Sequence, residues 1–331
     1  SRGLGDVYKR QELLNGSQKQ KVPYSAISDK IEIFNNSVEI SHGNLINMMF
    51  SKSELNYNIV HTLFSLSGRT DAYILKKYKS AYLRYSDDGF YQNTVGERLY
   101  TLYGNQIKRS YGFLKDDIFS PDAICFMKAN DNNNIDCTFY VHFYYREERL
   151  NVELTYKGSH LLEYTNSDLF IYSSLLSLMS HWLGVKAGSL ILKTHSIFIS
   201  ERDKERTEKL LDSCRLLKKV DLSLNHDFSS SLKSYREEFS DAINRVITWD
   251  IVEVSKRLNN EIEYINNNFT PYTQDLLFIL LADRFHSNTE EYKTILDKIN
   301  NDSIRCFKET VDRTEFNSIL EAVSYTHLRA H

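Results

Sequence analysis

Two neighbouring segments with strand character constrain the fold of this chain more than any other feature. Residues 137–146 (CTFYVHFYYR) and 149–157 (RLNVELTYK) alternate side chains in the way that half-buried β-strands do. The charged residues Arg146, Glu147 and Glu148 lie at the junction and predict a tight turn. The two segments therefore predict an antiparallel strand pair that is rich in aromatic residues.

A long apolar segment follows this strand pair. Residues 166–183 form the most apolar helical stretch of the chain, and Gly184 and Gly188 come directly after it. Residues 189–199 (SLILKTHSIFI) again have strand character. A helix between strands predicts an α+β fold in which the helix packs on the sheet.

The rest of the chain supplies further elements. A short alternating piece within residues 24–44 predicts a hairpin with Asn35 and Asn36 at its turn. The sequence also predicts two helices in residues 52–84, a helix over residues 99–114 and a buried strand over residues 123–129.

Three boundaries organise the chain into a fold domain and a helical extension. From about residue 204 the strand signal ends, and residues 211–321 predict an all-helical C-terminal extension with a separate packing role. Residues 12–210 form the predicted α+β domain. Residues 1–11 and 322–331 resemble translated sequencing-adapter sequence, so we expect them to lie outside the fold.

Composition and charge exclude several classes of protein. The net charge of −3 gives no basic field for nucleic acid, and no apolar run approaches the roughly 20 residues of a membrane-spanning helix. The first residues do not form a signal peptide. Four cysteines without CxxC spacing predict neither a disulfide framework nor a zinc site, and the histidines show no metal-binding spacing. We therefore expect a cytoplasmic protein without a bound metal and without a membrane or nucleic-acid partner.

Four segments, taken in order, resemble the thymidylate synthase family. They are LFSLSGRTD at 63–71, YSDDG through VGERL at 85–99, the strand pair that begins at Cys137, and LGVKAGSLILKTHSIFIS at 183–200. The resemblance covers residues 55–203. It implies a mixed, twisted sheet flanked by helices, a homodimer formed sheet to sheet, and one-carbon transfer to carbon five of a pyrimidine deoxynucleotide monophosphate. Methylenetetrahydrofolate is the donor that it implies.

The resemblance assigns roles to four positions. Cys137 matches the nucleophile that attacks carbon six of the pyrimidine. Lys157 stands where an arginine holds the phosphate, and it keeps the charge but loses the guanidinium fork. Asp168 stands where an asparagine reads the base edge, which favours cytosine because a carboxylate accepts from its exocyclic amine. His142 replaces a glutamine in the substrate site.

Many other positions of the family motif carry a different residue type. Pro121 and Asp122 replace the arginine pair lent by the partner subunit, and His61 replaces the glutamate that organises water. His160 replaces the aspartate that contacts folate. Phe198 and Ser200 replace the sugar-binding histidine and tyrosine, Thr138 replaces a histidine, and Gly158 replaces a phosphate-binding serine. The lost arginine contacts, partly offset by Lys157, correspond to about 4–6 kcal/mol of phosphate affinity.

A structural interpretation competes with each assigned role. Cys137 is also consistent with a small buried apolar residue of a strand, and Asp168 with the N-cap of the helix that follows it. Lys157 is also consistent with a solvated strand end. The aromatic residues Tyr140 to Tyr145 are more typical of a sheet core or a dimer interface than of a stacking platform.

Two functions from different classes follow. The first is a folate-dependent methyltransferase or hydroxymethyltransferase with a divergent active site. The second is a catalytically degenerate relative that keeps the dimeric scaffold and acts as a binding or interaction module through its helical extension.

Overall fold

The computed structural model describes residues 30–41, 52–71, 73–78, 86–87, 90–91, 94–127, 137–162, 165–205, 207–208, 231–285, 289–301, 305 and 308. Within these residues the chain divides into two compact units, each with its own internal contacts. Unit 1 draws on residues 1–48 and 98–221, and unit 2 draws on residues 49–97 and 222–331. The predicted domain boundaries, including the extension at 211–321, stay predictions.

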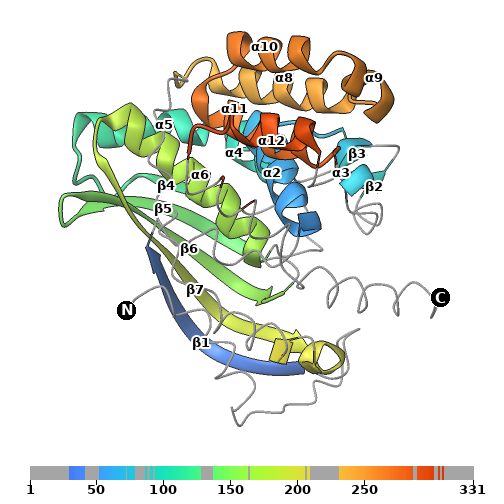
Figure 1. Ribbon diagram of the computed structural model, residues 1–331. Helices are drawn as coiled ribbons and strands as arrows, with labels where there is room; N and C mark the ends of the chain where they lie inside the picture. Colours follow the sequence, from blue (N-terminus) through green and yellow to red (C-terminus); the bar gives the residue numbers. More distant parts are fainter. Residues whose placement is uncertain are drawn as a thin grey trace. The chain divides into compact units, whose positions relative to one another are not determined.

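Unit 1 is built on a five-stranded mixed sheet with the strand order β1-β7-β6-β5-β4 (Figure 1). The strands are β1 (Lys30–Ser41), β4 (Ile124–Phe126), β5 (Thr138–Arg146), β6 (Arg149–His160) and β7 (Lys186–Ser200). The β6–β7 pair is parallel, and the other three pairs are antiparallel. A parallel neighbour requires a crossover between the strands, and the helix α6 (Thr165–Leu183) provides it.

The helices α5 (Gln106–Asp116) and α6 pack on one face of the sheet, and α6 contacts β6 and β7 (Figure 1). Nearly every residue of α6 is buried, which explains why this helix is apolar all round. Val141, Phe143, Val152 and Leu154 project from β5 and β6 to this face and are fully buried. The predicted α+β fold is therefore confirmed.

Gly184 and Gly188 end the crossover for two different reasons. Gly184 has a φ of +68° directly after α6, the left-handed position at which helices commonly end. Gly188 lies where a Cβ atom would come within 2.2 Å of the Asn151 amide oxygen. That oxygen accepts a hydrogen bond from the Ser189 backbone at 2.8 Å, so the contact ties β6 to β7.

Unit 2 is formed by helices. They are α2 (Lys52–Ser67), α3 (Tyr73–Tyr78), α8 (Tyr235–Ile247), α9 (Ile251–Lys256), α10 (Leu258–Asn268), α11 (Pro271–Ala282) and α12 (Glu290–Leu296), with a short hairpin of β2 (Ser86–Asp87) and β3 (Phe90–Tyr91). α2 packs against α8 and α11, so a helix from the first third of the chain shares a core with the C-terminal helices. α4 (Val95–Tyr100) spans the boundary between the two sets of residues.

A buried ion pair joins α8 to α10 within unit 2. Arg245 donates from Nε to a carboxylate oxygen of Glu261 at 2.6 Å and makes a second bond to the other oxygen. The indole nitrogen of Trp249 donates to the same carboxylate at 2.9 Å. Glu261 is fully buried, and these charge-assisted bonds satisfy it.

Two element predictions are wrong. The hairpin predicted within residues 24–44 is absent from the described residues 30–41, because β1 runs as one strand from Lys30 to Ser41 and pairs with β7 throughout. Asn35 has a φ of +50°, but the pairing register is the same on both sides of it. The predicted helix over residues 99–114 is divided into α4 and α5 by a turn in which Gly104 has a φ of +70°.

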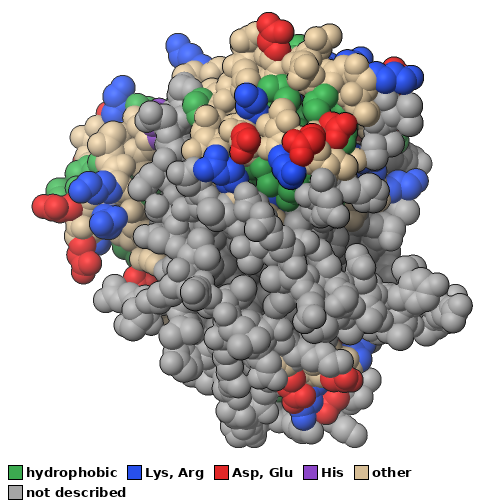
Figure 2. Space-filling view, in the orientation of Figure 1, with side chains coloured by type: hydrophobic (Ala, Val, Ile, Leu, Met, Phe, Trp, Pro, Cys, Tyr) green, Lys and Arg blue, Asp and Glu red, His purple; other side chains and the backbone are tan. Residues whose placement is uncertain are grey.

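Two further observations concern the distribution of charged side chains on the surface and the length of the apolar helices. Lys, Arg, Asp and Glu side chains are interspersed over the described part of the face in Figure 2. Among the described helices, none has the length and apolar character needed to cross a bilayer.

Candidate functional site

Cys137 lies immediately before β5, and its side chain is exposed. The backbone amide of Lys157 donates to the Cys137 carbonyl at 2.7 Å, which holds the two residues side by side at one end of the β5–β6 pair. The interpretation of Cys137 as a buried apolar residue is therefore wrong. Lys157 is exposed as well.

Cys125 on β4 shows the contrasting case of a structural thiol. It is fully buried, and its sulfur lies 3.5 Å from the Ser110 hydroxyl. Burial raises the pKa of this thiol to about 11, so it stays protonated at neutral pH. Of these two cysteines, Cys137 is the one that a ligand can reach.

Asp168 lies in the first turn of α6. The helix begins at Thr165, four residues earlier than the N-cap interpretation requires, so that interpretation is wrong. The side chain is half-buried and keeps part of its surface accessible. Burial raises the pKa of the carboxyl to about 7, because removal from water disfavours the charged form. The Tyr156 hydroxyl and the Arg98 charge act in the opposite direction.

Two buried tyrosines surround Asp168, and sequence reasoning missed both. Tyr156 lies on β6 opposite Thr138, and Tyr172 lies one turn after Asp168 on α6. Tyr156 is 2% exposed and Tyr172 is 0% exposed, yet neither hydroxyl has a hydrogen-bond partner of standard geometry. Tyr156 is nonetheless near enough for its hydrogen-bonding to lower the pKa of Asp168. Burial, then the Asp168 charge, raises the pKa of both phenols.

The strand pairing explains how these residues come together. Thr138 and Tyr156 are direct partners on the side of the sheet where α6 and Asp168 lie. Cys137 and Lys157 are the next residues toward the end of the same two strands. The end of the β5–β6 pairing therefore carries an exposed thiol and an exposed amine. Their chain neighbours Thr138 and Tyr156 belong to a polar cluster with Asp168 and Tyr172.

His142 lies farther along β5 and belongs to different surroundings. It pairs with Glu153 on the face of the sheet opposite α6, and its ring centroid is 5.6 Å from that of Tyr144. Burial lowers the pKa of this half-buried histidine, so it is neutral at pH 7. Among the described residues its Nε2 atom has no hydrogen-bond partner. The structure therefore groups Cys137 with Lys157 but not with His142.

Three positions that the resemblance assigned to folate and sugar binding lie together in unit 1. The Nε2 atom of His160 is 3.3 Å from the Ser200 hydroxyl and 3.5 Å from an Asp203 carboxylate oxygen. The His160 and Phe198 rings meet edge to face at 5.2 Å. His160 and Ser200 are each 3% exposed, so their polar atoms are directed at one another.

This packing does not fit a folate site of the family type. The resemblance requires an accessible carboxylate at the position of His160, but that residue is buried against Ser200 and Asp203. The Asp203 carboxylate does not substitute for it, because it is largely buried and directed at the His160 ring. The described residues also contain no group of three or more His, Cys, Asp or Glu side chains placed to hold a metal ion.

Comparison with known proteins gives one informative match. No protein-family model matches the chain. A deoxyuridylate hydroxymethyltransferase from Bacillus phage SP01 is 28% identical to it over 166 residues. The match covers 43% of this chain and 43% of the phage protein, so the chain spans less than half of that relative's length. The chain is thus similar to a transferase of pyrimidine nucleotide metabolism.

Proposed function

We propose that this chain is a divergent thymidylate synthase-like transferase that binds a pyrimidine deoxynucleotide monophosphate and modifies carbon five of its base. The observation that carries the proposal is the end of the β5–β6 pair. There the exposed residues Cys137 and Lys157 are joined by a backbone hydrogen bond, and the partly accessible carboxyl of Asp168 on α6 lies near Tyr156, the residue before Lys157. The similarity to a deoxyuridylate hydroxymethyltransferase supports the same substrate class.

Each residue has a defined part in this proposal. The Cys137 thiolate adds to carbon six of the pyrimidine, which makes carbon five nucleophilic. Lys157 binds the phosphate with its ammonium group. Asp168 hydrogen-bonds the polar edge of the base. Only the resemblance assigns His142 a role in substrate binding. In the structure this residue pairs with Glu153 and is not grouped with Cys137 and Lys157.

The donor and the oligomer are the finer parts of the proposal. Methylenetetrahydrofolate is the donor that the resemblance implies, although the packing around His160 does not support a site of the usual kind. A homodimer would use the face of the sheet opposite α6, where Tyr140, His142 and Tyr144 alternate with buried residues and are half-buried themselves. The proposed site diverges from that of the family, because Lys157, Pro121 and Asp122 stand where the family has phosphate-binding arginines.

Calorimetric binding of dUMP and dCMP tests the proposal directly, with and without a folate analogue. We expect both nucleotides to bind with a Kd below about 1 mM, which is roughly −4 kcal/mol. Lys157→Ala is expected to weaken binding by about tenfold, the value of one exposed charge-assisted contact of about 1.5 kcal/mol. Absence of binding for both nucleotides would refute the proposal.

The thiol is tested by turnover. Cys137→Ala is expected to lower the rate of hydroxymethyl or methyl transfer by at least about a hundredfold, because the covalent step is lost. Cys125→Ala is the matched control: it removes a buried thiol from the adjacent strand and should leave the chemistry intact. Equal activity of Cys137→Ala and the wild type would remove the thiol from the mechanism.

A further inference from the structure

Glu32 of β1 is a buried carboxylate of which the fold pairs one oxygen. The side chain is 6% exposed, and the Ser196 hydroxyl of β7 donates a hydrogen bond to its Oε1 atom. Among the described residues the Oε2 atom has no hydrogen-bond partner. A buried carboxylate is unfavourable unless its oxygens are hydrogen-bonded, so the unpaired oxygen is suited to a ligand that supplies the missing donor.

Glu32 differs from two other carboxylates that have a buried oxygen without a hydrogen bond. Asp203 and Asp283 share that property in the described part of the chain. However, Asp203 lies 3.5 Å from the His160 ring nitrogen, and Asp283 lies 3.6 Å from the Lys308 ammonium group. Glu32 makes no ion pair with any described residue. Its carboxylate is therefore the one of these three whose charge the described fold leaves without a basic neighbour.

The pairing of three strands places this carboxylate beside partly accessible surface. Ser196 of β7 pairs with Gly158 of β6, and Glu32 pairs with Phe198 of β7. Gly158 and Phe198 are both only partly buried. A Cβ atom at Gly158 would have Ser196 as its nearest neighbour, at an ordinary contact distance of 3.5 Å. A ligand group can therefore lie against β6 at Gly158, next to the Ser196 hydroxyl and the Glu32 carboxylate.

The hydrogen bonds already made determine which group can bind here. A carboxylate oxygen only accepts, and Ser196 has already donated its hydrogen to Glu32, so both side chains offer acceptors. A phosphate would be repelled, because it carries the same sign of charge. The polar edge of a pyrimidine presents a donor beside an acceptor, and that acceptor would remain unpaired. A hydroxyl group supplies a single donor and fits this arrangement.

We infer that Glu32 is a substrate-binding residue that accepts a hydrogen bond from the sugar of the nucleotide, and that Ser196 positions its carboxylate. A deoxynucleotide 5′-monophosphate has one free sugar hydroxyl, at carbon three, so this hydroxyl is the donor. The inference rests on the proposed function and extends it to recognition of the sugar. The protein should therefore select nucleotides that keep the 3′-hydroxyl.

A nucleotide without this hydroxyl measures the contact. The wild type should bind dUMP at least about tenfold more tightly than 2′,3′-dideoxyuridine monophosphate, the ratio expected for one hydrogen bond to a charged group. In Glu32→Ala the ratio should fall to about one. In Glu32→Gln it should fall to about threefold, because a neutral bond is roughly half as strong. Ligand-observed NMR measures both affinities into the millimolar range.

Glu39 provides the matched control. It is a second glutamate of β1 that accepts a hydrogen bond from a serine of β7, here Ser189 at 2.8 Å, but it is exposed. Glu39→Gln therefore makes the same chemical change on the same strand where water replaces the lost interaction. Its ratio of the two affinities should equal that of the wild type.

Thermal unfolding without nucleotide distinguishes a binding role from a structural one. Glu32→Gln should unfold at the temperature of the wild type or above it, because a neutral amide is less costly to bury than a carboxylate. A fall in Tm of more than about 4 °C would show that both oxygens serve the fold, and it would overturn the inference.

The binding outcomes separate this inference from the proposed function. Equal affinity of the wild type for the two nucleotides, or a wild-type ratio in Glu32→Gln, overturns the role of Glu32 and leaves the proposed function intact. Absence of dUMP binding to the wild type overturns both. If Glu32→Ala does not fold, the isosteric Glu32→Gln decides the question alone.

Discussion

Asp168 and Asp275 are two desolvated carboxyl groups in contrasting surroundings. Asp275 on α11 is fully buried, and it accepts hydrogen bonds from the backbone amides of Asn300 at 2.7 Å and Asn301 at 3.1 Å. The side-chain amide of Asn300 adds a third bond at 3.1 Å. Every acceptor of Asp275 thus serves the fold, whereas Asp168 keeps an accessible surface and unpaired hydroxyls beside it. This difference supports the proposed role of Asp168 in ligand binding.

Asp275 should give the protein a measurable dependence of stability on pH. Burial raises its pKa from 3.8 to about 6, so the folded state binds this proton more tightly than the unfolded state does. Its contribution is fully present below about pH 4 and is lost as pH rises through 6, by up to about 3 kcal/mol. Urea unfolding between pH 4 and pH 8 measures the effect. Asp275→Asn should flatten this part of the profile, and a slope equal to that of the wild type would contradict the assignment.

Single residues of the candidate site could be proposed from the sequence where residue type and position in the motif are enough to suggest a role. Cys137, Lys157 and Asp168 stand out by residue type and position in the motif. Tyr156 and Tyr172 could not be identified in this way, because their place near Asp168 depends on the strand register that brings Thr138 opposite Tyr156. The spacing of four residues between Asp168 and Tyr172 on a helix was the one signal available.

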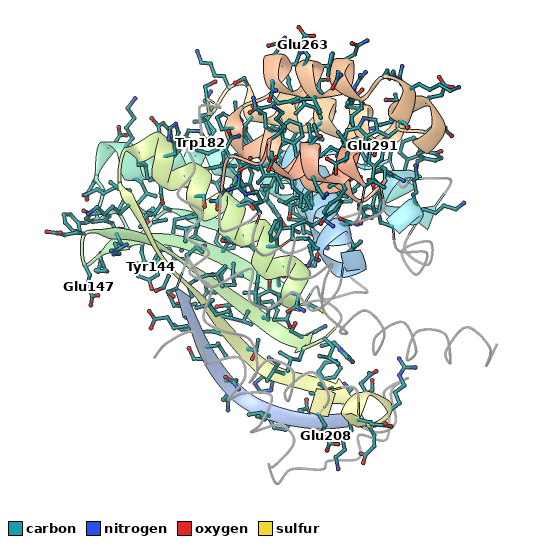
Figure 3. The ribbon with its side chains drawn as sticks, viewed as in Figure 1. Tyr144, Glu147, Trp182, Glu208, Glu263 and Glu291 are labelled. Carbon is teal, nitrogen blue, oxygen red and sulfur yellow. The ribbon has the colours of Figure 1, made fainter. Side chains whose placement is uncertain are left out.

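At the scale of elements, the β5–β6 hairpin was predicted closely because its signal is short-range. Its turn carries Glu147 with a φ of +52° and Glu148 with a φ of +58°. Two consecutive left-handed residues define a two-residue turn that favours asparagine and glycine. Glu147 lies at the tip of this hairpin, directed away from the sheet (Figure 3). Glutamate at both positions therefore strains the backbone without an evident contact in return.

Replacing this pair should stabilise the protein. Glu147→Asn combined with Glu148→Gly removes two side chains from the left-handed region, where an ordinary residue is unfavourable by about 1–2 kcal/mol. We expect an increase of about 1–2 kcal/mol in the free energy of unfolding, measured by denaturant titration. The reversed pair Glu147→Gly with Glu148→Asn tests whether position matters. A loss of stability in both variants would show that the glutamates make favourable contacts.

Elements that depend on distant partners were predicted less well. Asn35 and Asn36 are typical turn residues, and only the pairing with β7 shows that the chain continues through them. The helix predicted over residues 99–114 failed because the apolar pattern continues across Gly104, whose backbone does not remain helical. In both places a tertiary contact or a single φ angle overrode the local pattern.

At the scale of the whole molecule, one face of the sheet is covered by α5 and α6 (Figure 1). The other face carries half-buried aromatic and charged residues. On that second face the Tyr140 hydroxyl approaches Glu153 at 3.5 Å, and Lys193 pairs with Glu153 at 2.7 Å. A surface of aromatic residues with satisfied charges is suited to contact with a second copy of the chain.

We expect sedimentation equilibrium at micromolar concentration to give a dimer. The double variant Tyr140→Glu and Tyr144→Glu should shift the mass to the monomer, because two buried carboxylates would face one another across the interface. Phe113→Glu on α5, at a position that is 38% exposed, is the control for an added charge on an aromatic site elsewhere. A monomeric wild type, or a double variant that stays dimeric, would exclude this interface.

The pairing of β1 with β7 has a consequence for how the protein is made. β1 leaves the ribosome well before its partner β7, whose paired residues extend from Ser189 to Ser200. At about 5–20 residues per second, translation leaves β1 without its neighbour for on the order of ten seconds. During that interval Ile31, Val38 and Ile40, which the finished sheet buries, stay open to water and to other nascent chains. Production of soluble protein should therefore depend on chaperones more than the ordinary composition of the chain suggests.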